Sequence, residues 1–216
     1  TSPACSVVVD VSPPSVPDAA DLVEDPGIGQ SSTDNLTNVA TPEFTVTGIL
    51  EGNLASLYYI DDADNTTLID TQFVSSESVT FTTSALNSGI YTFFPTAEDT
   101  AGNEREGAKL QVIIDLEIPS ATITYDGDSL VRSEDVETVA TFIFSEVMDD
   151  ATLLPTVNVN YPDDPTSNEL DLTEEPLTKI NDTTWNYAIP LNTSGLDTID
   201  GVIALTLNSR DLAGNI

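Results

Sequence analysis

Apolar and polar side chains alternate with a period of two along most of the chain. Phe44-Thr45-Val46-Thr47 places two apolar side chains on one face and two threonines on the other, as in a half-buried strand. Similar segments in the first half are Ser56 to Ile60, Thr67 to Phe73, Ser78 to Thr82, Ile90 to Pro95 and Leu110 to Leu116. Those in the second half are Ala121 to Tyr125, Val136 to Ser145, Thr156 to Tyr161, Leu170 to Leu172, Thr184 to Leu191 and Val202 to Asn208.

Clusters of Gly, Pro, Asn and Asp separate these segments at intervals of roughly 10 residues, which is typical of β-sandwiches and not of alternating strand–helix units. The sequence therefore predicts an all-β fold. A helix is conceivable only at Asp18 to Glu24, and a single helical turn at Asp149 to Leu154.

Two short motifs each occur twice. Asp99-Thr100-Ala101-Gly102-Asn103 matches Asp211-Leu212-Ala213-Gly214-Asn215, and Ser6-Val7-Val8-Val9-Asp10-Val11 resembles Gln111-Val112-Ile113-Ile114-Asp115-Leu116. A segment with proline follows each copy of the second motif, namely Pro13-Pro14-Ser15 and Pro119-Ser120-Ala121. Such a repeat predicts modules in tandem. We expect an N-terminal strand and proline linker at 1–16, a first module at 17–117 and a second at 118–216.

The charge of the chain limits its partners. The 216 residues include 37 acidic and 5 basic side chains, which gives a net charge of −32. Self-repulsion of this size destabilises a compact state at low salt, so we expect the protein to work where salt or divalent cations screen it. Too few basic side chains are present to neutralise the phosphates of a nucleic acid or of an anionic membrane. A disordered acidic chain is the alternative, but recurring strand-like segments between the carboxylates argue against it.

The residues favour a protein that is not an enzyme. The chain has no histidine, so neither a Ser-His-Asp nor a Cys-His arrangement is available. Neighbouring carboxylates such as Glu174-Glu175 and Asp163-Asp164 are expected by chance in so acidic a chain, and we interpret them as a solvated face. No Gly-rich phosphate loop is present.

The single cysteine, Cys5, has no partner for an intrachain disulfide. It is either a small residue in a strand or the site of a lipid anchor or an intermolecular bond. No run of 18 apolar residues occurs, so no membrane-spanning helix is predicted. The acidity and the type of module favour an extracellular or cell-surface location, with a leader already removed.

Several motifs resemble a known family. In the first module an acidic loop at Asp25-Pro26-Gly27 is followed by Ser31-Ser32-Thr33-Asp34-Asn35-Leu36-Thr37-Asn38 and then by Pro42 and Phe44. This pattern resembles the calcium-associated type among the bacterial and archaeal Ig-like repeats of large surface adhesins and S-layer proteins. In the second module Phe144-Ser145-Glu146-Val147-Met148 and Trp185-Asn186-Tyr187 resemble another surface Ig-like type. The resemblance implies two tandem immunoglobulin-like β-sandwiches of about 100 residues each.

Calcium is the ligand that the acidic residues suggest, because Ca²⁺ binds six to eight oxygens from carboxylates, amides and carbonyls. A calcium ion at a module end would stiffen a junction by holding several loops together. The alternative is that these Asp and Asn residues form turns through hydrogen bonds to nearby backbone, which we favour for Asp99 and Asn103. No twelve-residue EF-hand loop is present. The candidate ligands are Asp21, Asp25, Asp34, Asn35, Asp99 and Asp115.

Four sequons permit N-glycosylation. They begin at Asn35, Asn65, Asn181 and Asn192. A glycan on Asn35 would compete with its use as a calcium ligand.

The second module is expected to lack its own closing strand. In the first module a closing strand at Lys109 to Leu116 follows the Asp-x-Ala-Gly-Asn motif, whereas only Ile216 follows the second copy. The chain also starts with a closing-type strand that contains Val7, Val8, Val9 and Val11. Either the sequence is an excerpt of a longer array, or this strand completes the second module of another copy by strand donation, which builds filaments head to tail.

We therefore expect an extracellular structural protein, a subunit of a surface filament or lattice whose partners are copies of itself or neighbouring Ig-like modules. The alternatives are an excerpt of a calcium-stiffened adhesin stalk or S-layer protein, and a surface module that binds glycans or cations. Exposed coplanar aromatic rings would favour glycan binding, and buried rings would favour scaffolding. The aromatic candidates are Tyr58, Tyr59, Tyr161 and Trp185.

Overall fold

The computed structural model of the chain describes residues 7–23, 33–126, 135–162, 171–191 and 201–216. Across these ranges the protein has sixteen strands and no helix. The predicted all-β fold class is confirmed. Since the described residues contain no helix, none of them is in a helix long and apolar enough to cross a membrane.

Both segments for which a helix was conceivable take other structures. Residues 21 and 22 form a short strand, and the Val23 N–H donates to the carbonyl of Glu43 at 2.9 Å. Burial of Leu22 against the core fixes this segment as extended. The segment after Asp149 bends without forming a helix, because its carboxylate accepts the backbone N–H groups of Ala151 and Thr152 at 3.0 Å.

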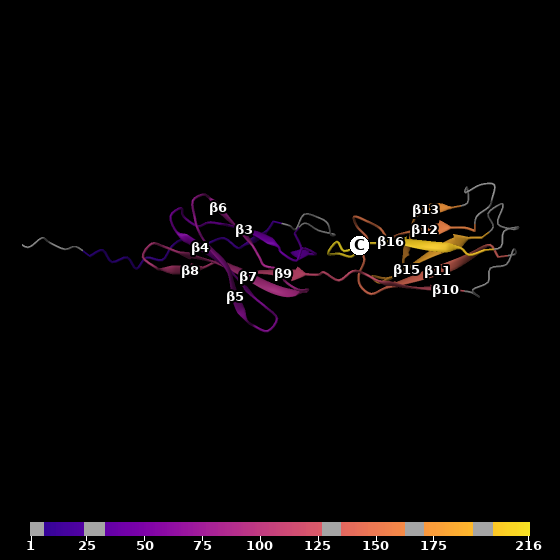
Figure 1. Cartoon of the computed structure of the whole chain (residues 1–216), viewed down its shortest axis with the longest axis horizontal. Helices are drawn as coiled ribbons and strands as arrows, with labels where there is room; N and C mark the ends of the chain where they lie inside the picture. The colour runs from indigo at the N-terminus through magenta and orange to yellow at the C-terminus, as the bar shows by residue number, and fades with distance from the viewer. Residues whose placement is uncertain (1–6, 24–32, 127–134, 163–170, 192–200) are drawn as a thin grey trace, which may run out of the picture. The chain divides into compact units, whose positions relative to one another are not determined.

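The described chain divides into two compact units, one ending at Leu116 and the other beginning at Glu117. We call them module 1 and module 2. Each is a two-layered β-sandwich, and Figure 1 shows the two sheets of each module as separate layers.

Module 1 pairs a three-stranded sheet with a larger one. The small sheet has the order β1-β3-β6, and the large sheet has the order β2-β9-β7-β4-β5, with β8 added beside β7. All pairs are antiparallel except the parallel pair of β2 and β9. The bounds are β1 Asp21–Leu22, β2 Leu36–Thr37, β3 Glu43–Thr47, β4 Leu54–Ile60, β5 Thr66–Phe73, β6 Ser78–Thr82, β7 Gly89–Glu98, β8 Glu104–Glu106 and β9 Leu110–Ile114.

The core of module 1 follows from the alternation in its strands. Phe44 and Val46 of β3 are fully buried, as are Phe93 of β7 and Val112 of β9. The rings of Phe44 and Phe93 lie 4.1 Å apart between their centroids and join the two sheets. Burial of a side chain of this size stabilises the fold by about 1.5–3 kcal/mol.

Module 2 has the same two layers with fewer strands. One sheet has the order β10-β11-β15-β14 and the other β13-β12-β16, all antiparallel. The bounds are β10 Ala121–Tyr125, β11 Glu137–Phe144, β12 Thr156–Asn160, β13 Leu172–Pro176, β14 Thr178–Lys179, β15 Thr184–Pro190 and β16 Ala204–Asn208.

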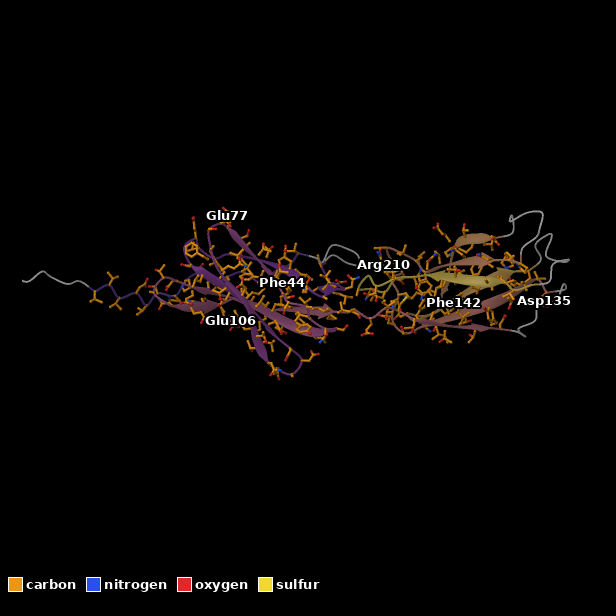
Figure 2. The ribbon with its side chains drawn as sticks, in the orientation of Figure 1. Phe44, Glu77, Glu106, Asp135, Phe142 and Arg210 are labelled. Carbon is orange, nitrogen blue, oxygen red and sulfur yellow. The ribbon has the colours of Figure 1, made fainter. Side chains whose placement is uncertain are left out.

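The core of module 2 is built on the pair of Phe142 and Trp185, which face each other across β11 and β15 and are both buried. The corresponding cross-strand pair in module 1 is Phe44 and Phe81. Figure 2 shows Phe44 and Phe142 among the side chains between the sheets of their respective modules. A buried pair of aromatic side chains on neighbouring strands therefore supports both sandwiches.

One predicted strand is unpaired in the structure. Residues 7 to 11, expected as a strand, belong to none of the described sheets. Their side chains are exposed, with Val8 at 90%. Alternation favours an extended conformation for this segment, but a strand needs a neighbour with which to exchange hydrogen bonds.

Candidate functional site

The first candidate site is the outer edge of β16 in module 2. Within the described residues β16 pairs with β12 alone. Its counterpart in module 1, β7, pairs with β4 on one side and with β9 on the other. The described part of module 2 has no strand in the position of β9, as the sequence led us to expect. Unpaired backbone groups along such an edge are a template for another strand.

The apolar side chains around this edge are incompletely covered. Leu205 and Leu207 of β16 pack against the core of module 2 but remain half-exposed. On the opposite sheet Ile123 and Tyr125 of β10 are 36% and 49% exposed. These two lie directly opposite the buried residues Phe142 and Ala140 of β11, so they are on the core-facing side of their sheet.

Module 1 shows what would cover such positions. Its closing strand β9 buries Val112 and Ile114 completely, or nearly so, between the sheets. Its first strand is also covered, with Leu22 only 6% exposed. The two partly exposed strands of module 2 therefore have the exposure expected of an immunoglobulin-like sandwich without a closing strand.

The second feature is the N-terminal valine segment, Val7, Val8, Val9 and Val11. The exposed fractions of these four side chains lie between 77% and 90%. Placing four such side chains in water forfeits the free energy of their burial, about 1.5–3 kcal/mol for each one fully buried. The segment therefore has the apolar side chains of a buried strand but pairs with none of the described strands.

The linker that follows this segment is attached to module 1. The Ser15 hydroxyl donates to the carbonyl of Gly48 at 2.8 Å, and the Thr47 hydroxyl donates to the Asp18 carboxylate at 2.8 Å. Gly48 has a φ of 78°, and a Cβ added there would lie 2.8 Å from an oxygen of Asp18. The close approach and the left-handed backbone both require glycine. The base of the valine segment is therefore fixed on its own module.

The Asp-x-Ala-Gly-Asn motif forms the same turn in both modules. Asp99 accepts the N–H groups of Ala101 and Asn103 at 2.9 Å, and the Asn103 amide donates to its second oxygen at 2.9 Å. The hydrogen bonds from Asn103 hold the pKa of Asp99 below its usual value. Asp99 and Asn103 therefore act as turn formers, the role we favoured from the sequence.

A third turn of this kind, which the sequence analysis missed, lies between β4 and β5. Asp61 accepts the N–H groups of Ala63 and Asn65 at 3.0 and 2.9 Å, and the Asn65 amide donates to both of its oxygens. Asp64, with a φ of 61°, takes the left-handed place of the motif's glycine. Asp and Asn tolerate this conformation better than most residues. Because Asp64 stands in place of the glycine, the motif was not recognised in the sequence.

The candidate calcium ligands that lie in the described part of module 1 are spread over several elements. Asp34 accepts the N–H of Leu36 at 3.1 Å, and the carbonyl of Asn35 accepts the N–H of Ile113 at 2.9 Å. Asp115 donates its N–H to the carbonyl of Thr37 at 2.9 Å. In this parallel pair Leu36 lies opposite Ile113 and Thr37 opposite Ile114, so Asp34 precedes the paired segment and Asp115 follows it.

The other candidate calcium ligands lie far from Asp115, on another strand, or outside the described residues. Asp99 follows the end of β7 that is opposite to Gly89, and Gly89 pairs with Ile114. The length of β7 places Asp99 about 30 Å from Asp115. Asp21 is an exposed residue of β1. Asp25 lies outside the described residues.

Two acidic residues of module 2 that were not among the candidates lie close together. Carboxylate oxygens of Glu146 and Asp211 are within 4.8 Å of each other. Asp211 is buried and accepts the N–H groups of Gly214 and Asn215 at 2.7 and 2.8 Å. Glu146 lies in the Phe-Ser-Glu-x-Met motif and Asp211 in the Asp-x-Ala-Gly-Asn motif. These motifs could have marked both residues as candidates in the sequence.

A buried ion pair also lies in module 2. The Arg210 guanidinium donates to the Asp149 carboxylate at 2.7 Å, and the Asp149 side chain is fully buried. Burial alone raises the pKa of Asp149, but hydrogen bonds from Thr152 and Arg210 outweigh burial and lower the pKa to about 2. Arg210 is one of 5 basic residues in the chain, and its pairing here is structural.

Most of the aromatic candidates for a glycan site pack into the cores. Trp185 and Tyr161 are buried in module 2, and Tyr59 packs against the core of module 1. Tyr58 differs, because it stacks on Phe94 with 5.3 Å between centroids and 11° between planes. The ammonium of Lys109 lies 5.4 Å from the Phe94 centroid. Buried rings favour scaffolding, and although Tyr58 and Phe94 are coplanar, Phe94 is only 8% exposed.

The sequons differ in how their asparagines are engaged. Asn65 donates its side-chain amide to Asp61. Asn181, in the exposed turn before β15, accepts hydrogen bonds from the N–H and hydroxyl of Thr183 at 3.0 and 3.3 Å. Asn35 has a left-handed backbone with a φ of 58°. Asn192 lies outside the described residues.

Comparison with known families decides the class of module 1. Residues 14–116 match the family described as the bacterial Ig-like domain. The match covers nearly all of module 1, which therefore resembles the bacterial Ig-like domain. The predicted resemblance to Ig-like modules and the predicted Ig-like fold are thereby confirmed for this module, and module 2 repeats its two-layered sandwich.

A similarity to a solved structure covers more of the chain. The crystal structure of a tetra-tandem repeat in the extending region of a large adhesion protein aligns with 93% of this chain and 46% of that one. The sequence identity is 15% and the TM-score is 0.33. The chain thus spans less than half the length of this solved protein. No curated protein matches the chain.

Proposed function

We propose that this chain is an extracellular structural protein whose copies join head to tail into a surface filament or lattice by strand donation. The observation that carries the proposal is the edge of β16, which is open within the described residues, together with the exposed valine segment at residues 7–11. One supplies a vacant strand position and the other supplies an unpaired apolar strand.

The two features match in sequence as well as in exposure. The valine segment resembles the part of the chain that closes module 1, with Val7 and Val9 at the places of Val112 and Ile114. Those two residues are buried in β9. A donated valine segment would therefore bring the same type of side chain to the same place between the sheets, and main-chain hydrogen bonds would add affinity.

The arrangement favours assembly beyond a dimer. Donor and acceptor are different surfaces of one molecule, so the contact is heterologous and each added copy leaves a new donor and a new acceptor. The attachment of Ser15 and Asp18 to module 1 limits the directions in which the donor leaves its module. The ordering cost of binding is lower for a donor fixed at its base.

The alternative is an excerpt of an adhesin stalk or S-layer protein, in which the next segment of a longer chain completes module 2. Both proposals place the protein at the cell surface, as expected for Ig-like modules of this kind. They differ in whether the 216-residue chain assembles with itself.

Light scattering coupled to size exclusion separates the two. The chain is run over a range of concentrations, in the presence and absence of a peptide spanning Ala4 to Val16. Strand donation predicts polymers that grow with concentration and shorten when the peptide is added. A monomer at all concentrations, indifferent to the peptide, would exclude donation between copies and leave the stalk excerpt.

A glycan-binding surface remains a second candidate, favoured only by the partly exposed ring of Tyr58, which stacks on the buried Phe94. Sugars bind to flat aromatic faces in part through apolar burial. A screen of immobilised glycans tests this candidate. Binding that is lost in Tyr58→Ala and retained in Tyr59→Phe would support it, and an absence of binding would remove it.

A further inference from the structure

We infer that the donated strand enters module 2 in one register, antiparallel to β16, with Val8 of the donor copy opposite Val202 of the acceptor copy. This inference rests on the proposed function and specifies its partner, a second copy of this chain, at the level of residue pairs. Four observations on the two modules lead to it.

The first observation defines which residues of β16 correspond to which residues of β7. In the turns at Asp99 and Asp211 the asparagine makes the same two hydrogen bonds to the aspartate, and the glycines Gly102 and Gly214 have φ values of 85° and 101°. Counting back from these turns places Leu207 of β16 at the position of Pro95 in β7. The neighbouring strands agree, because Leu57 lies opposite Pro95 and the equally buried Val157 lies opposite Leu207.

The second observation confirms the same residue-by-residue correspondence of β16 with β7 at the other end of the strand. It places Gly201 at the position of Gly89, the first residue of β7. A Cβ added to Gly89 would lie 3.5 Å from Asp62, and one added to Gly201 would lie 2.5 Å from Pro162. Asp62 and Pro162 each follow the end of the neighbouring strand by two residues. The two glycines therefore occupy the same place.

The third observation is that β16 is shorter than β7 where a partner is missing. Residues Gly89 to Tyr91 pair with β9 and not with β4, whose pairs begin at Thr92. Their counterparts in module 2 are residues 201–203, which belong to no strand. Val202 is 82% exposed. A donated strand supplies the partner that these residues lack and extends β16 to the length of β7.

The register follows from the pairs that β9 makes. Ile113 lies opposite Ile90, and Val112 lies opposite Tyr91. Since Val8 corresponds to Ile113 and Val202 to Ile90, the donor residue Val8 faces Val202. By the same offset Val7 lies opposite Ile203, which packs at the margin of the core of module 2.

The fourth observation explains why one register is preferred. Val7, Val9 and Val11 share one face of the donor and correspond to Val112, Ile114 and Leu116, which are buried or packed against the core. Val8 corresponds to Ile113, which is 41% exposed on the outer face. A slip by one residue would turn the three valines outward and leave only Val8 inside.

Disulfide formation between copies tests the register. The native thiol is removed by Cys5→Ser, and Val8→Cys is then combined with Val202→Cys. The matched control combines Val8→Cys with Thr206→Cys, since Thr206 is exposed on β16 and would share a face with Val202 once β16 is extended. Four residues of strand separate positions 202 and 206 by about 13 Å, beyond the reach of a disulfide.

Oxidation of the first double variant is expected to give a ladder of covalent multimers on a non-reducing gel. The control is expected to give at least ten-fold less. Light scattering on the reduced proteins is measured in parallel. Polymers that cross-link through position 206, or through neither position, would overturn the register and leave strand donation standing. Reduced proteins that stay monomeric and do not cross-link would overturn both.

Discussion

The Asn215 side-chain amide donates to the Asp211 carboxylate at 2.8 Å, and the Asn103 amide donates to Asp99 at 2.9 Å. Each asparagine also donates its backbone N–H to the other oxygen of the same carboxylate. The two turns follow corresponding strands of the two sandwiches, and they define which residues of β16 correspond to the residues of β7 that pair with the closing strand of module 1.

The turn of module 2 is expected to contribute more stability than that of module 1, because Asp211 is buried. Asp211→Ala leaves the N–H groups of Gly214 and Asn215 without their acceptor and is expected to cost about 2 kcal/mol. The chain's 1 tryptophan, Trp185, reports the unfolding of module 2 in urea. Asp99→Ala is the control and should leave the tryptophan transition unchanged. An Asp211→Ala variant with a wild-type midpoint would show that the turn has no such role.

The buried ion pair predicts an acid-sensitive module 2. The pKa of Asp149 is lowered to about 2, so this carboxylate contributes stability above its unfolded pKa of about 3.9 and loses it as the pH falls towards 2. The contribution is about 2 kcal/mol. Asp149→Asn should therefore be less stable than the wild type at pH 6, with the difference shrinking below pH 4. A difference that is constant between pH 6 and pH 2 would contradict this assignment.

Removal of the cation of this pair is expected to be more costly. Arg210→Ala leaves a buried carboxylate without its partner and should destabilise module 2 by about 3–5 kcal/mol. Lys179→Ala is the matched control, because Lys179 pairs with Asp150 and Asp182 at the surface and should cost less than 1 kcal/mol by the usual value for exposed pairs. Urea unfolding followed by Trp185 fluorescence measures both. Equal losses in the two variants would contradict the buried role of Arg210.

Calcium binding stays a prediction. Asp99 is engaged in its turn and lies far from Asp115, so an ion held by module 1 should depend on the loop that includes Asp25 and Asp34. Calcium should raise the unfolding temperature of the chain, and a chelator should reverse the effect. Asp25→Ala or Asp34→Ala should remove the calcium dependence, whereas Asp99→Ala should retain it. Calorimetry that detects no effect of calcium on the wild type would refute the prediction.

Glycosylation, where it occurs, is expected to favour Asn181 over Asn65. Asn65 donates its amide to the Asp61 carboxylate, which must be released before the nitrogen can be modified. Asn181 lies in an exposed turn and uses its side-chain oxygen as an acceptor. Glycopeptide mass spectrometry after incubation of the folded chain with an N-glycosylating enzyme gives both occupancies, and Asp61→Ala should raise that of Asn65. Higher occupancy at Asn65 than at Asn181 in the wild type would contradict this order.

The sequence predicted the strands well because their alternation is local. Phe44 and Val46 face the core and the threonines between them do not, as the pattern indicated. The short strands β1, β2, β8 and β14 were not predicted, since two or three residues carry too little periodicity. The pairing of Asp149 with Arg210 across 61 residues also lay beyond the sequence, because nothing local marks a long-range contact.

The candidate site was predictable where a motif repeats. Similarity between the segments at Val7 and Val112 indicated a closing-type strand, and the structure adds that this segment is exposed and that β16 has an open edge. The exposure of Ile123 and Tyr125 did not follow from the sequence, since alternation marks them as core residues. Burial depends on the opposite sheet, and that sheet lacks a strand within the described residues.

The most direct test of strand donation is a matched pair of charge substitutions in the donor. Val9→Asp places a carboxylate on the face that enters the core of module 2, and Val8→Asp places the same charge on the outer face. Light scattering should show monomers for Val9→Asp and polymers like those of the wild type for Val8→Asp. If the wild type forms polymers and Val9→Asp assembles as well as Val8→Asp, the valine segment does not complete module 2.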